Sequence, residues 1–177
     1  GSEMCIRDRQ NEGSVTSCDI HAHKVSLIEK GAARLGVSIV HARQADASQF
    51  EPEFEAGFDV VIADVPCSGL GVIRKKPDIR YKDLAPMQKL PQVQAAILEN
   101  VSRYVKPGGV LVYSTCTVLK RENENVANAF LARHPEFRLE VFALPAGLDA
   151  QTDGMLTLYP QLHEADGFFI CKLRKNV

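Results

Sequence analysis

The sequence predicts an α/β domain built on a mostly parallel sheet. Short apolar runs rich in β-branched residues alternate with helical segments of about a dozen residues, the pattern of strand–helix–strand units. With 177 residues, of which 45% are hydrophobic and 24% charged, the chain is large enough to bury the core of one domain. In such sheets ligands bind beyond the carboxyl ends of the strands.

The elements follow one another in a regular order. Strands are predicted at residues 15–19, 37–42, 58–63, 110–114, 137–142 and 167–173. Helices are predicted at residues 21–35, 92–105 and 121–134, and glycines follow the first two of them. The strands at 58–63 and 110–114 are expected to be buried, and the last two strands to pair antiparallel because no helix separates them. The proline-rich residues 76–91 are expected to form a long functional loop.

Residues 1–10 look foreign to the rest of the chain. Gly1 and Ser2 resemble a tag remnant, and the string MCIRDR resembles a translated sequencing adapter. The expectation is a tag and leader at 1–10, one domain at 11–177, and missing natural sequence upstream.

Composition excludes several classes of protein. The net charge of −1 means that a nucleic-acid partner would be held by local basic patches. No apolar run approaches the roughly 20 residues that span a bilayer, so no membrane partner is expected and the cytoplasm is the default location. The five cysteines form no C-x-x-C pair, which argues against a disulfide framework and against a zinc or other metal site. The oligomeric state is left open.

Two acids follow predicted strands. Asp19 ends the first strand and could accept hydrogen bonds from a ribose, although a helix N-cap is the alternative. Asp46 follows the second strand and could hold an adenine amino group or merely cap the loop at Ala47 and Ser48.

Two cysteines lie in polar turns at strand ends. Cys67 follows the Asp64-Val-Pro sequence, and Cys116 lies between two threonines after the strand at 110–114, so the two could approach one another at the sheet edge. In such turns a thiolate could be stabilised by backbone donors, which favours a nucleophile over packing. Cys18 and Cys171, inside strands, are expected to be small buried hydrophobes.

A basic run follows the first of these turns. It comprises Arg74, Lys75, Lys76 and Arg80, with Tyr81 beside them. Such a cluster is usually a solvated loop, but next to Cys67 it suggests phosphate contacts and a stacking surface for a nucleic acid.

The two cysteine motifs resemble those of a known family. Asp64-Val-Pro-Cys-Ser-Gly-Leu-Gly, the following Ile73-Arg-Lys-Lys-Pro-Asp-Ile-Arg, and Val112-Tyr-Ser-Thr-Cys-Thr-Val look like the bacterial Sun/Fmu family of RNA 5-methylcytosine methyltransferases. The closing Glu164-Ala-Asp-Gly-Phe-Phe-Ile is similar to that family's last hairpin. The resemblance runs from about Asn11 to Leu173 and implies a Rossmann-like methyltransferase fold.

The resemblance implies methylation of carbon 5 of a cytidine in small-subunit ribosomal RNA, with S-adenosylmethionine as methyl donor. It assigns the nucleophile to Cys116 and release of the covalent adduct to Cys67. Asp64 would lie against the cytosine's polar edge and near the methyl donor, while Asp19 and Asp46 would bind the ribose and adenine of the cofactor. Arg74, Lys75, Lys76 and Arg80 would contact RNA.

The sequence lacks upstream parts of the family's enzymes, among them the N-terminal RNA-binding domain, so the resemblance implies a truncated methyltransferase catalytic domain at residues 11–177. The family has a further strand and a glycine-rich loop of the type A-A-P-G-G-K upstream of the strand ending in Asp19, and this chain has neither. Weak or absent methyl transfer by this polypeptide is therefore expected. The alternatives are a catalytically dead RNA-binding or scaffold fragment, methylation of an amino nitrogen, and a redox switch between Cys67 and Cys116.

Overall fold

The structure is a computed structural model that describes residues 11–83, 85–144 and 152–177. The chain divides into two compact units, Gly1–Gln49 and Phe50–Val177, and each is described by itself. The prediction of a foreign leader at residues 1–10 lies outside the described residues.

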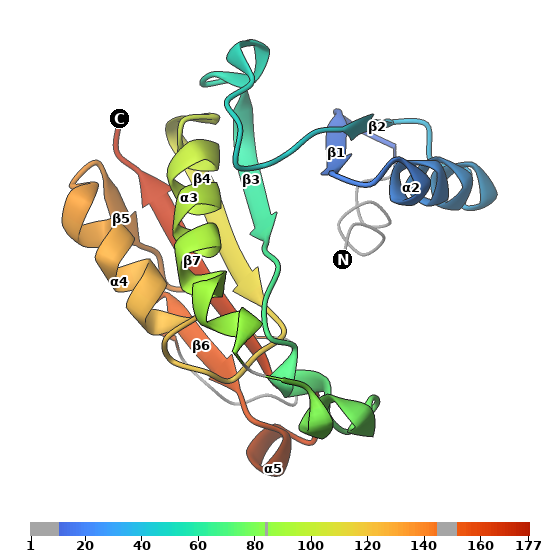
Figure 1. Ribbon diagram of the computed structural model, residues 1–177. Helices are drawn as coiled ribbons and strands as arrows, with labels where there is room; N and C mark the ends of the chain where they lie inside the picture. Colours follow the sequence, from blue (N-terminus) through green and yellow to red (C-terminus); the bar gives the residue numbers. More distant parts are fainter. Residues whose placement is uncertain (1–10, 84, 145–151) are drawn as a thin grey trace. The chain divides into compact units, whose positions relative to one another are not determined.

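The first unit is a strand–helix–strand motif. Strands β1 (Val15–Asp19) and β2 (Val40–Gln44) pair in parallel, and helix α2 (Ala22–Arg34) connects them (Figure 1). Gly36, the predicted helix stop, has φ +67°, the left-handed conformation that glycine adopts without strain. No residue of α2 is fully buried, because a sheet of two strands covers little of the helix. Cys18 is exposed, so its prediction as a buried hydrophobe was wrong.

The second unit is a five-stranded mixed sheet. Its strands are β3 (Phe58–Asp64), β4 (Val105–Thr115), β5 (Phe137–Leu139), β6 (Met155–Leu158) and β7 (Phe168–Lys175). The order is β3-β4-β7-β5, and β6 also pairs with β7. β3 and β4 are parallel, whereas β7 runs antiparallel to β4, β5 and β6. The predicted antiparallel pairing of the last two strands is confirmed, and β6 is an addition that the sequence analysis missed.

Helices α3 (Leu90–Ser102) and α4 (Glu124–Arg133) lie side by side over one face of this sheet (Figure 1). Their apolar side chains pack with the inward residues of β4 and β7 in a single core. The fully buried large side chains at its centre include Leu98, Leu111, Tyr113, Phe130, Phe169 and Leu173. Cys171 belongs to this core, where burial raises the pKa of its thiol to about 12, so it is a packing residue as predicted.

Strand β3 is buried on one face only. Val60 is 42% exposed and Ile62 is 51% exposed, while Ala63 is buried. Among the described residues of this unit β3 pairs only with β4, so it is an edge strand. The prediction of a buried strand was therefore wrong for the face of Val60 and Ile62. Apolar side chains on an open edge strand are costly to leave in water.

The loop predicted at residues 76–91 contains two short 3₁₀ turns, Pro77–Tyr81 and Pro86–Lys89, and its last two residues already belong to α3. A third such turn, Leu70–Val72, precedes the loop. Each of the two turns within the loop begins at a proline, whose fixed φ suits the first position of a helical turn. Ile79 is buried and anchors the middle turn. A short helix, α5 (Pro160–His163), precedes β7. Within the described part of the chain, no helix is long and apolar enough to cross a membrane.

Candidate active site

The site is centred on two thiols at the carboxyl ends of neighbouring parallel strands. β3 and β4 pair in a register that sets Asp64 opposite Ser114, so the turns that follow the two strands begin side by side. The Sγ atoms of Cys67 and Cys116 lie 3.1 Å apart, and the backbone N–H of Cys116 donates to the Cys67 sulfur at 3.3 Å. Both side chains are partly accessible to solvent. The structure thus brings together the two cysteines, as their positions in turns at strand ends suggested.

Several direct hydrogen bonds join the two turns. The hydroxyls of Ser68 and Thr117 are 2.8 Å apart, and the backbone N–H of Gly71 donates to the carbonyl of Cys116 at 3.0 Å. Gly71 also accepts from the N–H of Gly167 at 2.8 Å, which ties the first turn to the segment before β7. A Cβ at Gly71 would lie 2.0 Å from the Gly167 carbonyl oxygen, so only glycine permits this approach.

Glu122 is the buried residue that connects these turns to the helices. One of its carboxylate oxygens accepts from the backbone N–H of Ser68 at 2.8 Å and from the side chain of Gln94 at 3.1 Å. The same Gln94 amide donates to the carbonyl of Pro66 at 3.0 Å. Both Glu122 and Gln94 are fully buried. Such a carboxylate and amide fix the backbone on both sides of Cys67.

The neighbouring Asn123 holds the second turn. Its side-chain oxygen accepts from the Thr115 hydroxyl at 2.6 Å, and its amide donates to the Thr117 carbonyl at 2.9 Å. The buried Asn123 side chain therefore holds both chain neighbours of Cys116 in place. Sequence analysis missed Glu122, Asn123 and Gln94, because it treated them as ordinary helical positions. Two adjacent polar residues, Glu122 and Asn123, directly before an apolar helix were the available signal.

The two thiols differ in acidity. The hydrogen bond that Cys67 donates lowers the pKa of the Cys116 thiol, against the opposing effects of burial and of the carboxylates of Asp64 and Glu122. The same hydrogen bond, with burial, raises the pKa of the Cys67 thiol. Cys116 is therefore the sulfur that ionises first, and Cys67 retains a proton beside it. The principal stabiliser of the thiolate is thus the second thiol, whereas sequence analysis expected backbone donors.

Asp64 ends β3 at the same edge. Its carboxylate accepts from the hydroxyl of Ser114 at 3.2 Å, and the side chain is exposed. Asp64, Cys67 and Cys116 thus belong to one cluster, which combines an acid, a proton-carrying thiol and an ionisable thiol.

Asp19 and Asp46 belong to the first unit. Asp19 ends β1, accepts from the backbone N–H of His21 at 2.9 Å and forms an ion pair with Lys24 at 3.5 Å. Asp46 follows β2 and accepts from both the N–H and the hydroxyl of Ser48, which lowers the pKa of its carboxyl. Because β1 and β2 are parallel, both acids follow strands at one edge of this small sheet. Asp46 makes the loop contacts that its alternative interpretation described. Asp19 is not the N-cap of α2, because His21 occupies that position and Asp19 accepts from the His21 N–H.

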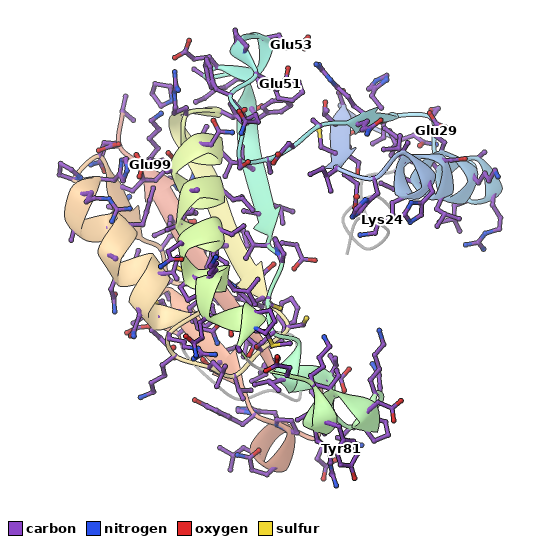
Figure 2. All side chains as sticks on the ribbon, viewed as in Figure 1. Lys24, Glu29, Glu51, Glu53, Tyr81 and Glu99 are labelled. Carbon is purple, nitrogen blue, oxygen red and sulfur yellow. The ribbon has the colours of Figure 1, made fainter. Side chains whose placement is uncertain are left out.

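The basic run is partly neutralised. Lys75 forms an ion pair with Asp166 at 2.5 Å, and one guanidinium nitrogen of Arg74 donates to the carbonyl of Glu164 at 3.4 Å. Lys76 and Arg80 are exposed, and Tyr81 is 83% exposed on the outer side of this segment (Figure 2). Across the described ranges, no group of three or more His, Cys, Asp or Glu residues could hold a metal ion.

Comparison with known proteins gives a consistent result. The model of the family described as 16S rRNA methyltransferase RsmB/F matches residues 4–174. The chain is 44% identical over 174 residues to the probable ribosomal RNA small subunit methyltransferase B of Bacillus subtilis (strain 168), covering 94% of this chain and 39% of that relative. It is 34% identical to ribosomal RNA small subunit methyltransferase F of Cronobacter sakazakii (strain ATCC BAA-894), with 94% and 36% covered.

Among solved structures, the crystal structure of NSun6 from Pyrococcus horikoshii with SFG is similar. The TM-score is 0.83 at 29% identity, over 98% of this chain and 44% of that one. The chain thus spans well under half the length of these relatives. The predicted Rossmann-like methyltransferase fold is confirmed. With a family model that matches almost its whole length, the chain belongs to the 16S rRNA methyltransferase RsmB/F family.

Proposed function

We propose that the chain carries the nucleophilic part of an RNA methyltransferase that modifies carbon 5 of a cytidine through a covalent cysteine adduct. The observation that carries this proposal is the thiol pair, with sulfurs 3.1 Å apart at the carboxyl edge of a parallel strand pair. A methyltransferase acting on an amino nitrogen would need no such pair. The printed names of the relatives support small-subunit ribosomal RNA as the substrate.

The chemistry assigns a role to each residue of the cluster. Carbon 5 of cytosine is a poor nucleophile until a thiolate adds to carbon 6, which gives carbon 5 enamine character. Cys116 makes that addition, because the hydrogen bond from Cys67 favours its thiolate. Asp64 lies at the same edge, where a carboxyl group against the polar side of the base favours the protonated adduct. Once carbon 5 carries the methyl group, a base takes the remaining proton of that carbon. The electron pair of the C–H bond re-forms the double bond between carbons 5 and 6, Cys116 leaves as a thiolate, and Cys67 assists this release.

S-adenosylmethionine fits the acids of the first unit by their chemistry. Asp19 and Asp46 are carboxylates after parallel strands, where oxygen acceptors suit ribose hydroxyls and an adenine amino group. When bound, this group supplies an electrophilic methyl. The relative solved with SFG, an analogue of S-adenosylmethionine, supports this cofactor. Asp19 would exchange its contact with Lys24 for the ligand.

The basic run is the proposed RNA contact. Arg74, Lys76 and Arg80 carry exposed positive charge beside the thiol turns, while Lys75 is already paired with Asp166. A target base must leave its stack to reach a thiol in a turn, and contacts to flanking phosphates hold the strand while it does so. The cytoplasm, where ribosomal RNA is found in bacteria, is the proposed place of action.

Residues 11–177 are proposed to be part of a longer catalytic domain. The open edge of β3, with Val60 and Ile62 exposed, supports a further strand beside it. The same observation favours a second candidate, an inactive RNA-binding fragment, for this polypeptide alone. The chain extended upstream to the length of its relatives is then the active form.

The test compares the two forms of the protein. Calorimetry measures binding of S-adenosylmethionine, and transfer of a tritiated methyl to small-subunit ribosomal RNA measures activity. The extended chain is expected to bind and transfer, and the present chain to do so weakly or not at all. If the extended chain binds S-adenosylmethionine but methylates no RNA cytidine, the proposed reaction is wrong.

A further inference from the structure

A cleft of about 490 Å³ opens beside the thiol turns in the second unit. Its walls include Ile73, Pro77, Val118 and Pro160, and two arginines, Arg74 and Arg80, line it as well. The volume lies within the range of pockets that hold one small ligand, roughly 300–1,000 Å³. The lining is thus mainly apolar, with positive charge supplied by two guanidinium groups.

The cleft borders the turns that carry Cys67 and Cys116. Gly71 lines it and donates its backbone N–H to the carbonyl of Cys116 at 3.0 Å. Val118, on another wall, is two residues beyond Cys116. The cleft therefore shares its Gly71 and Val118 walls with the turns that carry the two thiols.

The contacts of the neighbouring basic residues decide which positive charges remain available at the cleft. Lys75 is paired with Asp166 at 2.5 Å, so its charge is largely neutralised. Arg74 donates one nitrogen to the Glu164 carbonyl at 3.4 Å, which restrains its side chain while its remaining N–H groups stay available. Arg80 is exposed at the same cleft. Planar guanidinium groups suit phosphate oxygens, and proline and aliphatic walls suit the flat face of a base.

We propose that this cleft binds a nucleotide adjacent to the target cytidine, with its base against the apolar walls and its phosphate on Arg74 and Arg80. The inference rests on the proposed function. A base that leaves its stack deprives its neighbour of a stacking partner, and the cleft replaces that partner. The cleft thus stabilises the strand in the conformation that exposes the target base.

The test uses the chain extended upstream and short single-stranded RNAs that contain one cytidine. Fluorescence anisotropy gives the dissociation constant at several salt concentrations for the wild type, Arg74→Gln, Arg80→Gln and the control Lys89→Gln. Lys89 is exposed and does not line the cleft. Each arginine variant is expected to lower the slope of log K against log salt by about 0.7, the value for one phosphate on a single strand. Lys89→Gln is expected to keep the wild-type slope.

A second set of RNAs tests the base. Replacing the nucleotide on one side of the cytidine by an abasic one is expected to weaken wild-type binding about tenfold, the effect of one lost stacking contact. Ile73→Ala removes part of the apolar wall, so in this variant the abasic nucleotide is expected to weaken binding by less than in the wild type. Equal slopes for all variants and equal binding of abasic RNAs would overturn the cleft inference while the proposed function stands. If the wild type binds none of the RNAs, both the cleft inference and the proposed function fail.

Discussion

The sulfurs of Cys67 and Cys116 lie 3.1 Å apart although the two residues belong to turns after different strands. Their separation is set by the parallel register of β3 and β4 and by the buried bonds of Ser68, Thr117 and Glu122. At this distance the two thiols share a proton, so the ionisation of one depends on the presence of the other.

The first prediction concerns this dependence. The hydrogen bond from Cys67 lowers the pKa of the Cys116 thiol, so Cys67→Ala is expected to raise that pKa. The rate of alkylation of Cys116 by iodoacetamide, followed against pH by mass spectrometry, should therefore reach its midpoint at higher pH in the variant. Cys171→Ser, in the core, is the control for a nonspecific effect of losing a thiol. An unchanged midpoint in Cys67→Ala would contradict the proposed coupling.

The second prediction concerns Glu122. Glu122→Ala removes the acceptor of two buried donors, the Ser68 N–H and the Gln94 amide, and unsatisfied buried donors cost about 1–3 kcal/mol each. Urea unfolding is expected to show a decrease of about that size per donor in the free energy of unfolding. The alkylation of Cys116 should no longer follow a single rate. Glu122→Gln keeps one acceptor oxygen and should lose less stability. It should also lower the pKa of Cys116, because the Glu122 charge raises it. Wild-type stability in Glu122→Ala would show that these bonds contribute nothing.

The third prediction concerns the contact between Gly71 and Gly167. In Gly71→Ala the new Cβ would lie 2.0 Å from the Gly167 carbonyl oxygen and 2.8 Å from the Cys116 carbonyl oxygen. Both neighbours are backbone atoms, so the turns must separate, at about 1–3 kcal/mol or more. Gly57→Ala, whose nearest neighbour would be at 3.1 Å, is the milder control. The midpoint of thermal unfolding should be highest for the wild type, lower for Gly57→Ala and lowest for Gly71→Ala. Equal midpoints would contradict the close approach.

The fourth prediction concerns pH and the contact between α3 and α4. His134 lies between Glu99 at 2.9 Å and Glu136 at 2.8 Å and stacks on Phe130. Burial opposes its protonation, but the two carboxylates outweigh burial and raise the pKa of His134 above 6.5. The pKa values of Glu99 and Glu136 are lowered below 4.5.

Because the folded pKa of His134 is raised, its contribution is complete below its unfolded pKa and is lost as the pH rises through the folded value. The contributions of Glu99 and Glu136 are lost as the pH falls through their folded pKa values. The cluster therefore stabilises most near pH 5–6, by under about 1 kcal/mol because the glutamates are half exposed. His134→Gln should flatten the decline of the unfolding free energy between pH 6 and 8. An identical decline in the variant would contradict this.

The sequence predicted most of the elements but few of the contacts between them. Periodicity located α2, α3, α4 and six of the seven strands of the described residues, since hydrophobic patterns are local. β6 was missed because it has only four residues and its pairing with β7 is remote in sequence. Strand β3 was expected to be more buried than it is, because burial depends on neighbours that periodicity does not reveal.

For the site, too, the sequence predicted positions along the chain but not the contacts between elements. Motif position predicted that Cys67, Cys116 and Asp64 would follow neighbouring strands. The roles of Gln94, Glu122 and Asn123 could not be predicted, because each acts through bonds to residues of other elements. The ion pair between Lys75 and Asp166 likewise depends on folding, and it involves one of the four cations predicted to contact RNA.

The most direct test of the account uses Cys67→Ala in the chain extended upstream, incubated with small-subunit ribosomal RNA and S-adenosylmethionine and run on a denaturing gel. The account predicts a protein–RNA adduct that accumulates in Cys67→Ala and is absent from the double variant Cys67→Ala/Cys116→Ala, with no turnover in Cys116→Ala alone. An adduct that persists without Cys116, or normal methylation by Cys116→Ala, would contradict the assignment of Cys116 as the nucleophile.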